Sequence, residues 1–270
     1  MRVALLGGGT IGRLVLERAR QGDLPGVEIV AMAGRSRSSP AAALAREFGI
    51  PYVAGGEIIA ARPDTVVEAA SHAAVKEHLV ALLEAGINVV VLSAGALVDD
   101  ALRHSAEEAA GRSGALLYVP SGGIGGLDVL KTACIAGVEE ATIQVAKPPV
   151  AWKGIAYVEQ RGFQLDGLKG PLTLFEGPAR AGVPHFPQNV NIAAVLALAG
   201  IGWDRTRLKV VADPALKLNT HTIHVAGRSG RFSVVLENVP SPENPKTSWL
   251  ACYSALAALK SLGSRVRSGT

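Results

Sequence analysis

The stretch Val3-Ala4-Leu5-Leu6-Gly7-Gly8-Gly9-Thr10-Ile11-Gly12 decides the fold, because a short apolar run passes directly into a glycine-rich turn. The turn contains the pattern Gly-x-Gly-x-x-Gly. In a strand-turn-helix setting, the first glycine permits the tight turn, the second lets the backbone approach a pyrophosphate, and the third allows close packing of helix on strand. A glycine turn without a ligand is the alternative, which the flanking strand and helix disfavour. The residues expected to contact a dinucleotide here are Gly7, Gly9, Thr10, Ile11 and Gly12.

Short apolar runs alternate with amphipathic segments over the first 120 residues. The runs at 3–6, 27–33, 65–69, 88–92 and 116–119 predict buried strands, and helical periodicity predicts helices at 11–20, 40–48, 72–85 and 99–111. Ser71 and Asp99 stand where helix N-caps are expected. Such alternation is typical of a parallel sheet with right-handed crossovers. The predicted fold class is therefore α/β, with an N-terminal doubly wound parallel sheet of the Rossmann dinucleotide-binding type.

The pattern changes after Pro120. A glycine-rich stretch at 121–126 leads into a predicted helix at 127–136, and beyond it strands predominate. The runs at 141–146, 172–176, 208–212, 220–226 and 232–237 predict a second α+β domain built on a mixed sheet, with a helix at 190–199. We therefore expect a dinucleotide-binding domain at 1–120 and a substrate and catalytic domain at 121–245. The remaining segment, 246–270, contains a predicted helix at 248–262 that packs back on the first domain.

The composition excludes several classes of protein. Hydrophobic residues make up 49% and charged residues 19% of the 270 residues, which is typical of a compact globular chain. Lys and Arg number 27 against 23 Asp and Glu, and this dispersed excess does not indicate a nucleic-acid binder. No apolar stretch reaches the roughly 18 residues that a membrane span needs. The two cysteines, Cys134 and Cys252, give neither a disulfide framework nor zinc-ligand spacing, so we expect no metal site and a cytoplasmic location.

The end of the second predicted strand bears on the choice between NAD and NADP. An acidic side chain there binds the ribose 2′-hydroxyl of NAD, whereas an arginine accommodates the 2′-phosphate of NADP. The sequence reads Ala33-Gly34-Arg35-Ser36-Arg37 and offers no carboxylate. We therefore predict NADP or NAD as the cofactor, with Arg35 and Ser36 beside the 2′-phosphate. The alternative is that these arginines belong to a solvated loop. Ala69, at the end of another predicted strand, is expected beside the cofactor as well.

Several short segments follow the glycine turn in a characteristic order. They are Glu68-Ala69-Ala70-Ser71-His72, Ser93-Ala94-Gly95-Ala96-Leu97, Pro120-Ser121-Gly122-Gly123-Ile124-Gly125-Gly126-Leu127-Asp128, Pro187-Gln188-Asn189-Val190-Asn191, Asp213-Pro214 and Asn219-Thr220-His221-Thr222-Ile223. Together their order and spacing resemble the L-aspartate dehydrogenase family over the whole chain. The family usually has Ala where this chain has Gly123, a difference of one methyl group.

This resemblance implies an activity and a set of site residues. It implies oxidation of L-aspartate to iminoaspartate, which yields oxaloacetate and ammonia and supplies NAD biosynthesis. It places Gly123 and Asn189 in contact with the dinucleotide and makes His221 the catalytic residue. It also implies a homodimer.

Oxidation of an amino acid requires the nitrogen to lose a proton while hydride leaves Cα, and a base with a pKa near neutrality suits that step. Histidine has an ordinary pKa of about 6.5, so the six histidines are the candidates. His221 and His224 lie three apart on a predicted strand and therefore face opposite sides. Asn219 and His221 share one face, which favours His221 as the base. A hydrogen-bonded strand histidine without a catalytic role is the alternative.

Aspartate carries two carboxylates, so its site needs cationic or N–H donors at two points. Ser121, Lys217 and Thr220 are the residues we expect to bind substrate. Lys147 and the backbone N–H groups of 122–126 are further candidates, although most lysines are surface charges.

Two other classes of function fit the sequence. One is a nicotinamide-dependent reductase of another small amino-acid derivative, similar to dihydrodipicolinate reductase or homoserine dehydrogenase, and the fold alone does not separate these. The other is a non-catalytic NADP-binding sensor whose second domain is a partner surface. Cys134 lies within a predicted helix with no histidine nearby in the sequence, and Cys252 lies in the last predicted helix, which disfavours a semialdehyde dehydrogenase with a nucleophilic cysteine.

Overall fold

The structure is a computed structural model that describes residues 1–187, 189–241 and 248–266. The chain divides into two compact units. Of the described residues, unit 1 comprises Met1–Pro120 together with 252–266, and unit 2 comprises those between Ser121 and Ala251.

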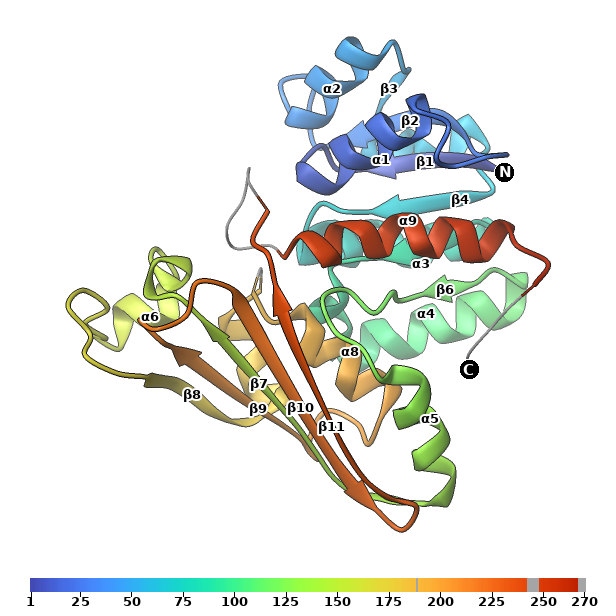
Figure 1. The fold of residues 1–270 in the computed structure, drawn as a ribbon. Coiled ribbons are helices and arrows are strands. Elements are labelled where there is room, and N and C mark those ends of the chain that lie inside the picture. The colour runs from blue at the N-terminus through green and yellow to red at the C-terminus, as the bar shows by residue number, and fades with distance from the viewer. Residues whose placement is uncertain (188, 242–247, 267–270) are drawn as a thin grey trace. The chain divides into compact units, whose positions relative to one another are not determined.

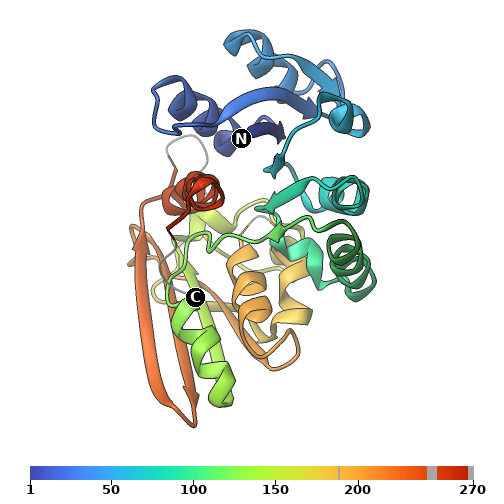
Figure 2. The same ribbon diagram turned by 90° about the vertical axis from the view of Figure 1, so that its right-hand side faces the viewer.

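Unit 1 contains a six-stranded parallel sheet with the strand order β3-β2-β1-β4-β5-β6. Figure 2 shows α1 and α9 on one face of this sheet and α3 and α4 on the other. This arrangement confirms the predicted doubly wound fold class. The strands are β1 (Arg2–Leu6), β2 (Glu28–Gly34), β3 (Tyr52–Ala54), β4 (Thr65–Glu68), β5 (Asn88–Val91) and β6 (Leu117–Tyr118); the α-helices are α1 (Thr10–Arg20), α2 (Pro40–Phe48), α3 (His72–Glu84), α4 (Asp100–Ser113) and α9 (Trp249–Gly263).

Helix ends in unit 1 follow from local side chains. Ser39, Ser71 and Asp99 each accept a hydrogen bond from a backbone N–H of the first helical turn, which fixes the starts of α2, α3 and α4. The last helix contacts α1, because the guanidinium of Arg18 donates to the Tyr253 hydroxyl (2.8 Å) and lies over its ring. The C-terminal helix from Cys252 onward therefore belongs to unit 1.

The strand predictions for unit 1 differ from the structure in two places. The structure contains β3, a three-residue strand that the sequence pattern does not separate from the neighbouring loop. The predicted strand at 116–119 shortens to Leu117–Tyr118, and Leu116 is 47% exposed. Both strands lie at the edges of the sheet, where pairing on one side only gives short, half-exposed segments with a weak hydrophobic signal.

Unit 2 contains a five-stranded mixed sheet with the strand order β11-β10-β7-β9-β8, as predicted. β7 pairs with β9 in parallel, while the other neighbours are antiparallel. Helices α5 and α8 pack against the sheet (Figure 1). The strands are β7 (Val138–Lys147), β8 (Leu172–Pro178), β9 (Thr206–Ala212), β10 (Asn219–Gly227) and β11 (Gly230–Asn238); the α-helices are α5 (Leu127–Ala136), α6 (Ala156–Gln160), α7 (Ala179–Gly182) and α8 (Asn191–Ala199).

The two faces of the unit 2 sheet differ in burial, because side chains alternate along each strand. On β10 the side chains of Asn219, His221, Ile223 and Val225 are buried, whereas His224 is exposed. On β7 the buried series runs through Ala141, Ile143 and Val145 and ends at Lys147. The register pairs His221 with Val145 on one side and Leu236 on the other. These residues therefore share the covered face of the sheet, and its polar members gather at one end.

Candidate active site

Three of the four glycines in the turn of unit 1 are required by close packing. A Cβ on Gly7, which has φ +117°, would lie 2.6 Å from the carbonyl oxygen of Ala69, and one on Gly12 would lie 2.7 Å from that of Gly7. A Cβ on Gly8 would overlap the backbone of Ala41 in α2. Gly9 is the exception, since nothing lies within 4 Å of its Cβ position. The open space is therefore at the second glycine of the motif, where a pyrophosphate approaches the backbone.

The amino end of α1 is suited to an anion. Its N-cap is Gly9, which offers no side-chain acceptor, and its first turn contains no acidic residue. By contrast, the side chains of Ser39, Ser71 and Asp99 cap α2, α3 and α4. The N–H groups of the first turn, which begins with Thr10 and Ile11, are thus left for another acceptor. This chain's residues therefore fit the diphosphate of a nicotinamide dinucleotide.

The other predicted cofactor residues of unit 1 lie at the same edge of the parallel sheet as the glycine turn. Gly7, Arg35 and Ala69 each follow directly the carboxyl end of a strand, β1, β2 and β4 respectively. The Tyr52 hydroxyl binds the carbonyl oxygens of Gly34 (3.1 Å) and Ser36 (2.6 Å), which fixes the backbone on both sides of Arg35. Arg35 and Ser36 are exposed. The region around Arg35 thus presents a cation and a hydroxyl, and no carboxylate, directly after β2.

Glu68 is a residue that the sequence patterns did not single out for a role. It is 1% exposed and accepts hydrogen bonds from the backbone N–H groups of Ala70, Ser71 and Ser93 and from the Ser93 hydroxyl. Burial raises the pKa of this carboxyl, and the four hydrogen bonds act in the opposite direction. Glu68 joins the loops that follow β4 and β5, so it holds the shape of the edge that carries the predicted cofactor residues.

His221 lies on β10 in unit 2 and is 1% exposed. Its Nδ1 lies 2.9 Å from the carbonyl oxygen of Gly123, and the Asn238 side-chain amide donates to the same oxygen (2.9 Å). Asn238 Nδ2 also lies 3.0 Å from His221 Nδ1. A carbonyl oxygen accepts and never donates, so in the tautomer that hydrogen-bonds to Gly123 the proton of the neutral ring is on Nδ1. The lone pair is therefore on Nε2, a buried atom for which the described residues provide no hydrogen-bond partner.

Burial lowers the pKa of His221 to about 4; the hydrogen bond to Gly123 raises it, and the charge of Lys147 lowers it further. The imidazole is consequently neutral at pH 7. In the tautomer with the proton on Nδ1, the neutral ring presents a bare, buried Nε2 that can accept a proton.

Asn219 adds a second unmatched acceptor on the same face of β10. It is fully buried, its Nδ2 donates to the Ser248 hydroxyl over 3.4 Å, and its Oδ1 has no partner among the described residues. Buried polar atoms are nearly always hydrogen-bonded, so each exception calls for an explanation. Two unmatched acceptors on side chains two residues apart would suit a ligand that brings N–H groups.

Lys147 ends β7 on the covered face and is 2% exposed. Its Nζ donates to Asn189 Oδ1 (3.2 Å) and lies 5.4 Å from the centre of the Trp152 ring. Burial lowers the pKa of Lys147 to about 7. Asn189 is 6% exposed and stands just before α8. Lys147, Asn189, Asn219, His221 and Asn238, together with the carbonyl of Gly123, are hereafter the His221 cluster.

The structure does not bring every predicted substrate residue to the His221 cluster. Lys217 is exposed in the connection between β9 and β10. Thr220 lies between Asn219 and His221 on β10, so its side chain is on the opposite face of the sheet. Ser121 is half-buried in the loop whose Gly123 carbonyl binds His221. Asn238 is a cluster member that the sequence analysis missed; it continues the inward series of residues 232, 234 and 236 on β11.

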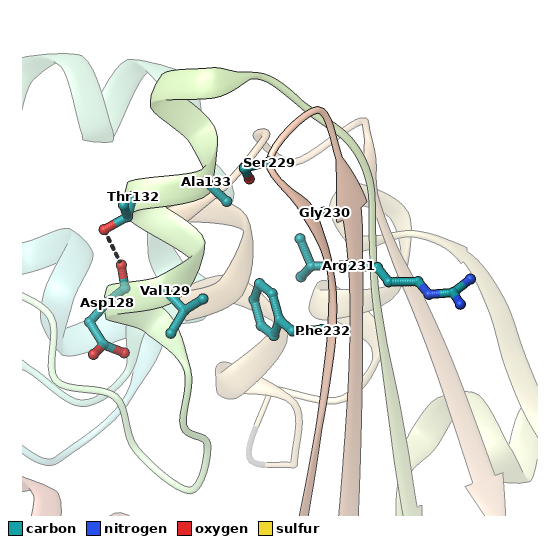
Figure 3. A pocket seen from close by; sticks show the side chains of 9 residues that line it. Asp128, Val129, Thr132, Ala133, Ser229, Gly230, Arg231 and Phe232 are labelled. Atoms are coloured by element: carbon teal, nitrogen blue, oxygen red, sulfur yellow. Dashed lines mark hydrogen bonds between the residues drawn. The ribbon is translucent and has the colours of Figure 1, made fainter.

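A pocket of about 430 Å³ lies elsewhere in unit 2, between α5 and the β10–β11 hairpin (Figure 3). Val129 and Phe232 form apolar walls, and the Arg231 side chain points away from α5. The Thr132 hydroxyl binds the Asp128 carbonyl within the helix (2.9 Å). None of the predicted site residues lines this pocket, and its polar side chains do not converge, so it is not the candidate site.

Two further properties concern the described part of the chain. Within it, no cluster of three or more His, Cys, Asp or Glu side chains is arranged to hold a metal ion. A search of the same residues finds no helix long and apolar enough to cross a membrane.

The fold of unit 1 and its glycine turn define a Rossmann-type dinucleotide-binding protein, and comparisons with known proteins narrow the class to the NAD(P)-dependent dehydrogenases. Residues 7–120 match the family description "Homoserine dehydrogenase, NAD binding domain", and residues 128–262 match "Aspartate dehydrogenase, C-terminal". The chain is 41% identical to L-aspartate dehydrogenase of Methanosarcina acetivorans over 272 residues, with full coverage of both chains. It is also 41% identical to L-aspartate dehydrogenase 2 of Bordetella pertussis over 261 residues, or 96% of each chain.

A solved structure is similar to this chain over its whole length. The crystal structure of aspartate dehydrogenase from Thermotoga maritima superposes with a TM-score of 0.76 at 29% identity, covering 100% of this chain and 99% of the other. The chain therefore belongs to the L-aspartate dehydrogenase family, and its cofactor is a nicotinamide dinucleotide, NAD or NADP.

Proposed function

We propose that this protein catalyses the NAD(P)-dependent oxidation of L-aspartate to iminoaspartate, which water then converts to oxaloacetate and ammonia. The family membership supports the substrate, since relatives of about 40% identity over the whole chain are named L-aspartate dehydrogenase. The observation that carries the chemistry is the pair of buried, unmatched acceptors, His221 Nε2 and Asn219 Oδ1. These two atoms suit an amino group, which has N–H bonds to donate and a proton to give up.

The proposed role of His221 follows from the charge of the substrate. Near pH 7 the α-nitrogen of an amino acid is protonated, whereas formation of the C=N bond requires its lone pair. His221 Nε2 accepts the proton, and Asn219 Oδ1 accepts a hydrogen bond from a remaining N–H. The Gly123 carbonyl oxygen accepts from Nδ1–H and so favours this tautomer, while Asn238 donates to the same oxygen. When bound, the nicotinamide supplies the acceptor for the hydride that leaves Cα.

The binding residues follow the same proposal. Gly7, Gly9, Thr10, Ile11 and Gly12 hold the diphosphate at the amino end of α1, and Ala69 lies beside the cofactor. Arg35 and Ser36 bind the 2′-phosphate when the cofactor is NADP. Gly123 and Asn189 contact the dinucleotide, and Ser121 binds substrate; these three rest on the family resemblance and the sequence.

A spectrophotometric assay tests the proposed function. The purified protein is incubated with each of L-aspartate, L-asparagine, L-glutamate and L-alanine, with NAD and with NADP, and the absorbance of the reduced nicotinamide is followed. We expect the highest kcat/KM for L-aspartate. No reduction with L-aspartate, or a higher kcat/KM for another amino acid, contradicts the proposal; cofactor binding without turnover of any amino acid would favour the sensor.

We further propose that the protein is a homodimer and acts in the cytoplasm. The family resemblance supports the dimer, and two cysteines without a disulfide pattern suit a reducing compartment. Light scattering after size-exclusion chromatography gives the mass of the particle directly, and the mass of a single chain would contradict the dimer.

A further inference from the structure

Lys147 is the one member of the His221 cluster to which neither the family resemblance nor the proposed mechanism gives a task. It closes the inward-facing series of β7, so it shares the covered face with Asn219 and His221 on the neighbouring strand. Its Nζ donates to Asn189, a residue expected at the cofactor. The charge of Lys147 also lowers the pKa of His221, which places the ammonium close enough to influence the base.

The burial of this ammonium group is costly. Long charged side chains are almost never fully buried in proteins, because the charge loses its hydration. The described buried polar side chains of unit 2 are Lys147, Asn189, Thr206, Asn219, His221, Asn238, Ser241 and Ser248, and none of them is acidic. A site that keeps a lysine inside, among amides, hydroxyls and an imidazole, is chemically complementary to an incoming anion.

Asp213 is an acidic residue at the same end of the sheet as Lys147, but its carboxylate makes its hydrogen bond elsewhere. Asp213 follows β9, the parallel neighbour of β7, and its backbone N–H donates to the Lys147 carbonyl oxygen (3.0 Å). The Asp213 carboxylate accepts from the Ala215 N–H (2.9 Å) at the partly exposed start of the next loop. On the other side, β10 contributes His221, and the Trp152 ring faces the ammonium group. Among the described residues, His221 is a titratable group whose pKa the charge of Lys147 lowers.

We propose that Lys147 is a substrate-binding residue whose ammonium group forms an ion pair with a carboxylate of the substrate. This inference deepens the proposed function and rests on it for the identity of the substrate. A buried ammonium paired with a carboxylate gives a strong, charge-assisted hydrogen bond. Asn219 and His221 then receive the amino group while Lys147 receives the acid, so the cluster complements both ends of an amino-acid zwitterion.

The ion pair also connects substrate binding to the base. A carboxylate beside Lys147 offsets the positive charge that lowers the pKa of His221, so the imidazole becomes a better proton acceptor when substrate is bound. The same carboxylate raises the pKa of Lys147 above its free value of about 7. Binding of a dicarboxylate at about pH 8 is therefore expected to take up a proton from solution.

Two variants and a control test the proposal. Lys147→Met removes the charge and keeps an unbranched side chain, and Lys147→Gln keeps a donor for Asn189 without the charge. Lys209→Met is the control, because Lys209 is a partly exposed lysine of the adjacent strand that pairs with Glu176 (3.6 Å). Thermal unfolding establishes that each variant is folded. Steady-state kinetics with L-aspartate and calorimetry with succinate, a dicarboxylate without an amino group, are then measured, the latter in buffers of different ionisation enthalpy.

We expect both Lys147 variants to raise KM for L-aspartate by about tenfold to a hundredfold, to weaken succinate binding and to abolish proton uptake, while Lys209→Met behaves as wild type. If Lys147→Gln restores wild-type KM, the lysine acts only by positioning Asn189 and the proposal is overturned. It is equally overturned if succinate does not bind the wild type, or binds with equal affinity and proton uptake in Lys147→Met. A wild type that binds succinate through Lys147 but does not oxidise L-aspartate refutes the proposed function and leaves the anion site standing.

Discussion

Glu68 in unit 1 and the His221 cluster in unit 2 both place ionisable groups inside the protein, but with opposite hydrogen-bonding states. Glu68 accepts four hydrogen bonds from two loops of its own unit. In the His221 cluster, by contrast, His221 Nε2 and Asn219 Oδ1 are buried acceptors without a partner among the described residues. Burial alone therefore does not mark a functional group.

The difference indicates how to separate structural from functional polar groups in this molecule. A satisfied buried carboxylate stabilises the loops that donate to it, and its removal leaves their N–H groups without partners. An unsatisfied buried acceptor lowers stability, and for His221 and Asn219 we propose that substrate binding is the reason it is kept. Replacement at the two sites should consequently affect different properties, stability at Glu68 and catalysis at His221.

The largest effect is expected for His221→Ala. A positioned proton acceptor contributes about 10²–10⁴-fold to the rate, so kcat with L-aspartate should fall by that order. Cofactor affinity and the melting temperature should stay near wild type, because the lost hydrogen bond to Gly123 is offset by the remaining donor, Asn238. The pH–rate profile should lose the limb that belongs to the base.

His224→Ala is the matched control for that variant. His224 lies on the same strand, but it is exposed and binds the Ser233 hydroxyl (2.7 Å) on the outer face of the sheet. Its replacement should leave kcat and the pH profile close to wild type. A His221→Ala enzyme that keeps most of its kcat would remove His221 from the chemistry and favour the hydrogen-bonded strand histidine.

Arg35→Ala should have the next largest effect. It extends the comparison with the buried His221 cluster, because the groups of unit 1 that we expect to bind the cofactor's 2′-phosphate are exposed. Loss of a charge-assisted hydrogen bond to phosphate costs about 1.5–3 kcal/mol, or roughly ten- to a hundredfold in the dissociation constant of NADP. NAD has no 2′-phosphate, so its affinity should change little. Titration of both cofactors measures the difference, and equal weakening of the two would place Arg35 in a solvated loop.

Glu68→Gln tests the structural side of the comparison. The side-chain amide places an NH₂ group where one carboxylate oxygen accepted, so a donor such as the Ser93 N–H loses its partner. A buried donor without a partner costs about 1–3 kcal/mol, which should appear in the free energy of unfolding. The dependence of kcat on pH should not move. A change in that profile with unchanged stability would make Glu68 functional and reverse the assignment.

The sequence predicts unit 1 well because its signals are local. The strand, the glycines and the helix start lie within Val3 to Gly12, and the N-caps Ser71 and Asp99 sit directly before their helices. Each choice depends on neighbours a few residues away, so periodicity and turn chemistry suffice. The short edge strands β3 and β6 are not predicted correctly, because they bury too few side chains to give a clear hydrophobic pattern.

The His221 cluster depends on pairings over long sequence separations. The contact of His221 with Gly123 spans 98 residues, that of Asn238 with Gly123 spans 115, and that of Lys147 with Asn189 spans 42. Strand register decides these contacts, and a shift of one residue exchanges the two faces. This explains why the sequence preferred the exposed Lys217 to the buried Lys147. The alternation of inward-facing and outward-facing positions along residues 141–147 of β7 is the one sequence signal that could have favoured Lys147 over Lys217.

The smallest effect is expected at Gly123, where the family resemblance leads us to expect alanine. A Cβ at this position would lie 3.4 Å from both His221 Cε1 and Ser248 Cβ and 3.6 Å from Asn238 Nδ2, which is ordinary contact. Gly123→Ala should therefore leave kcat nearly unchanged and raise stability by about 0.4–1 kcal/mol, because alanine restricts the unfolded chain. Gly123→Val adds two methyl groups beside the imidazole and should weaken cofactor binding while the fold is retained. Cofactor titration and thermal unfolding of both variants check these expectations. Unchanged cofactor affinity in a well-folded Gly123→Val protein would remove the loop at 121–126 from the cofactor site. A destabilised Gly123→Ala protein would show that the space beside His221 is already filled.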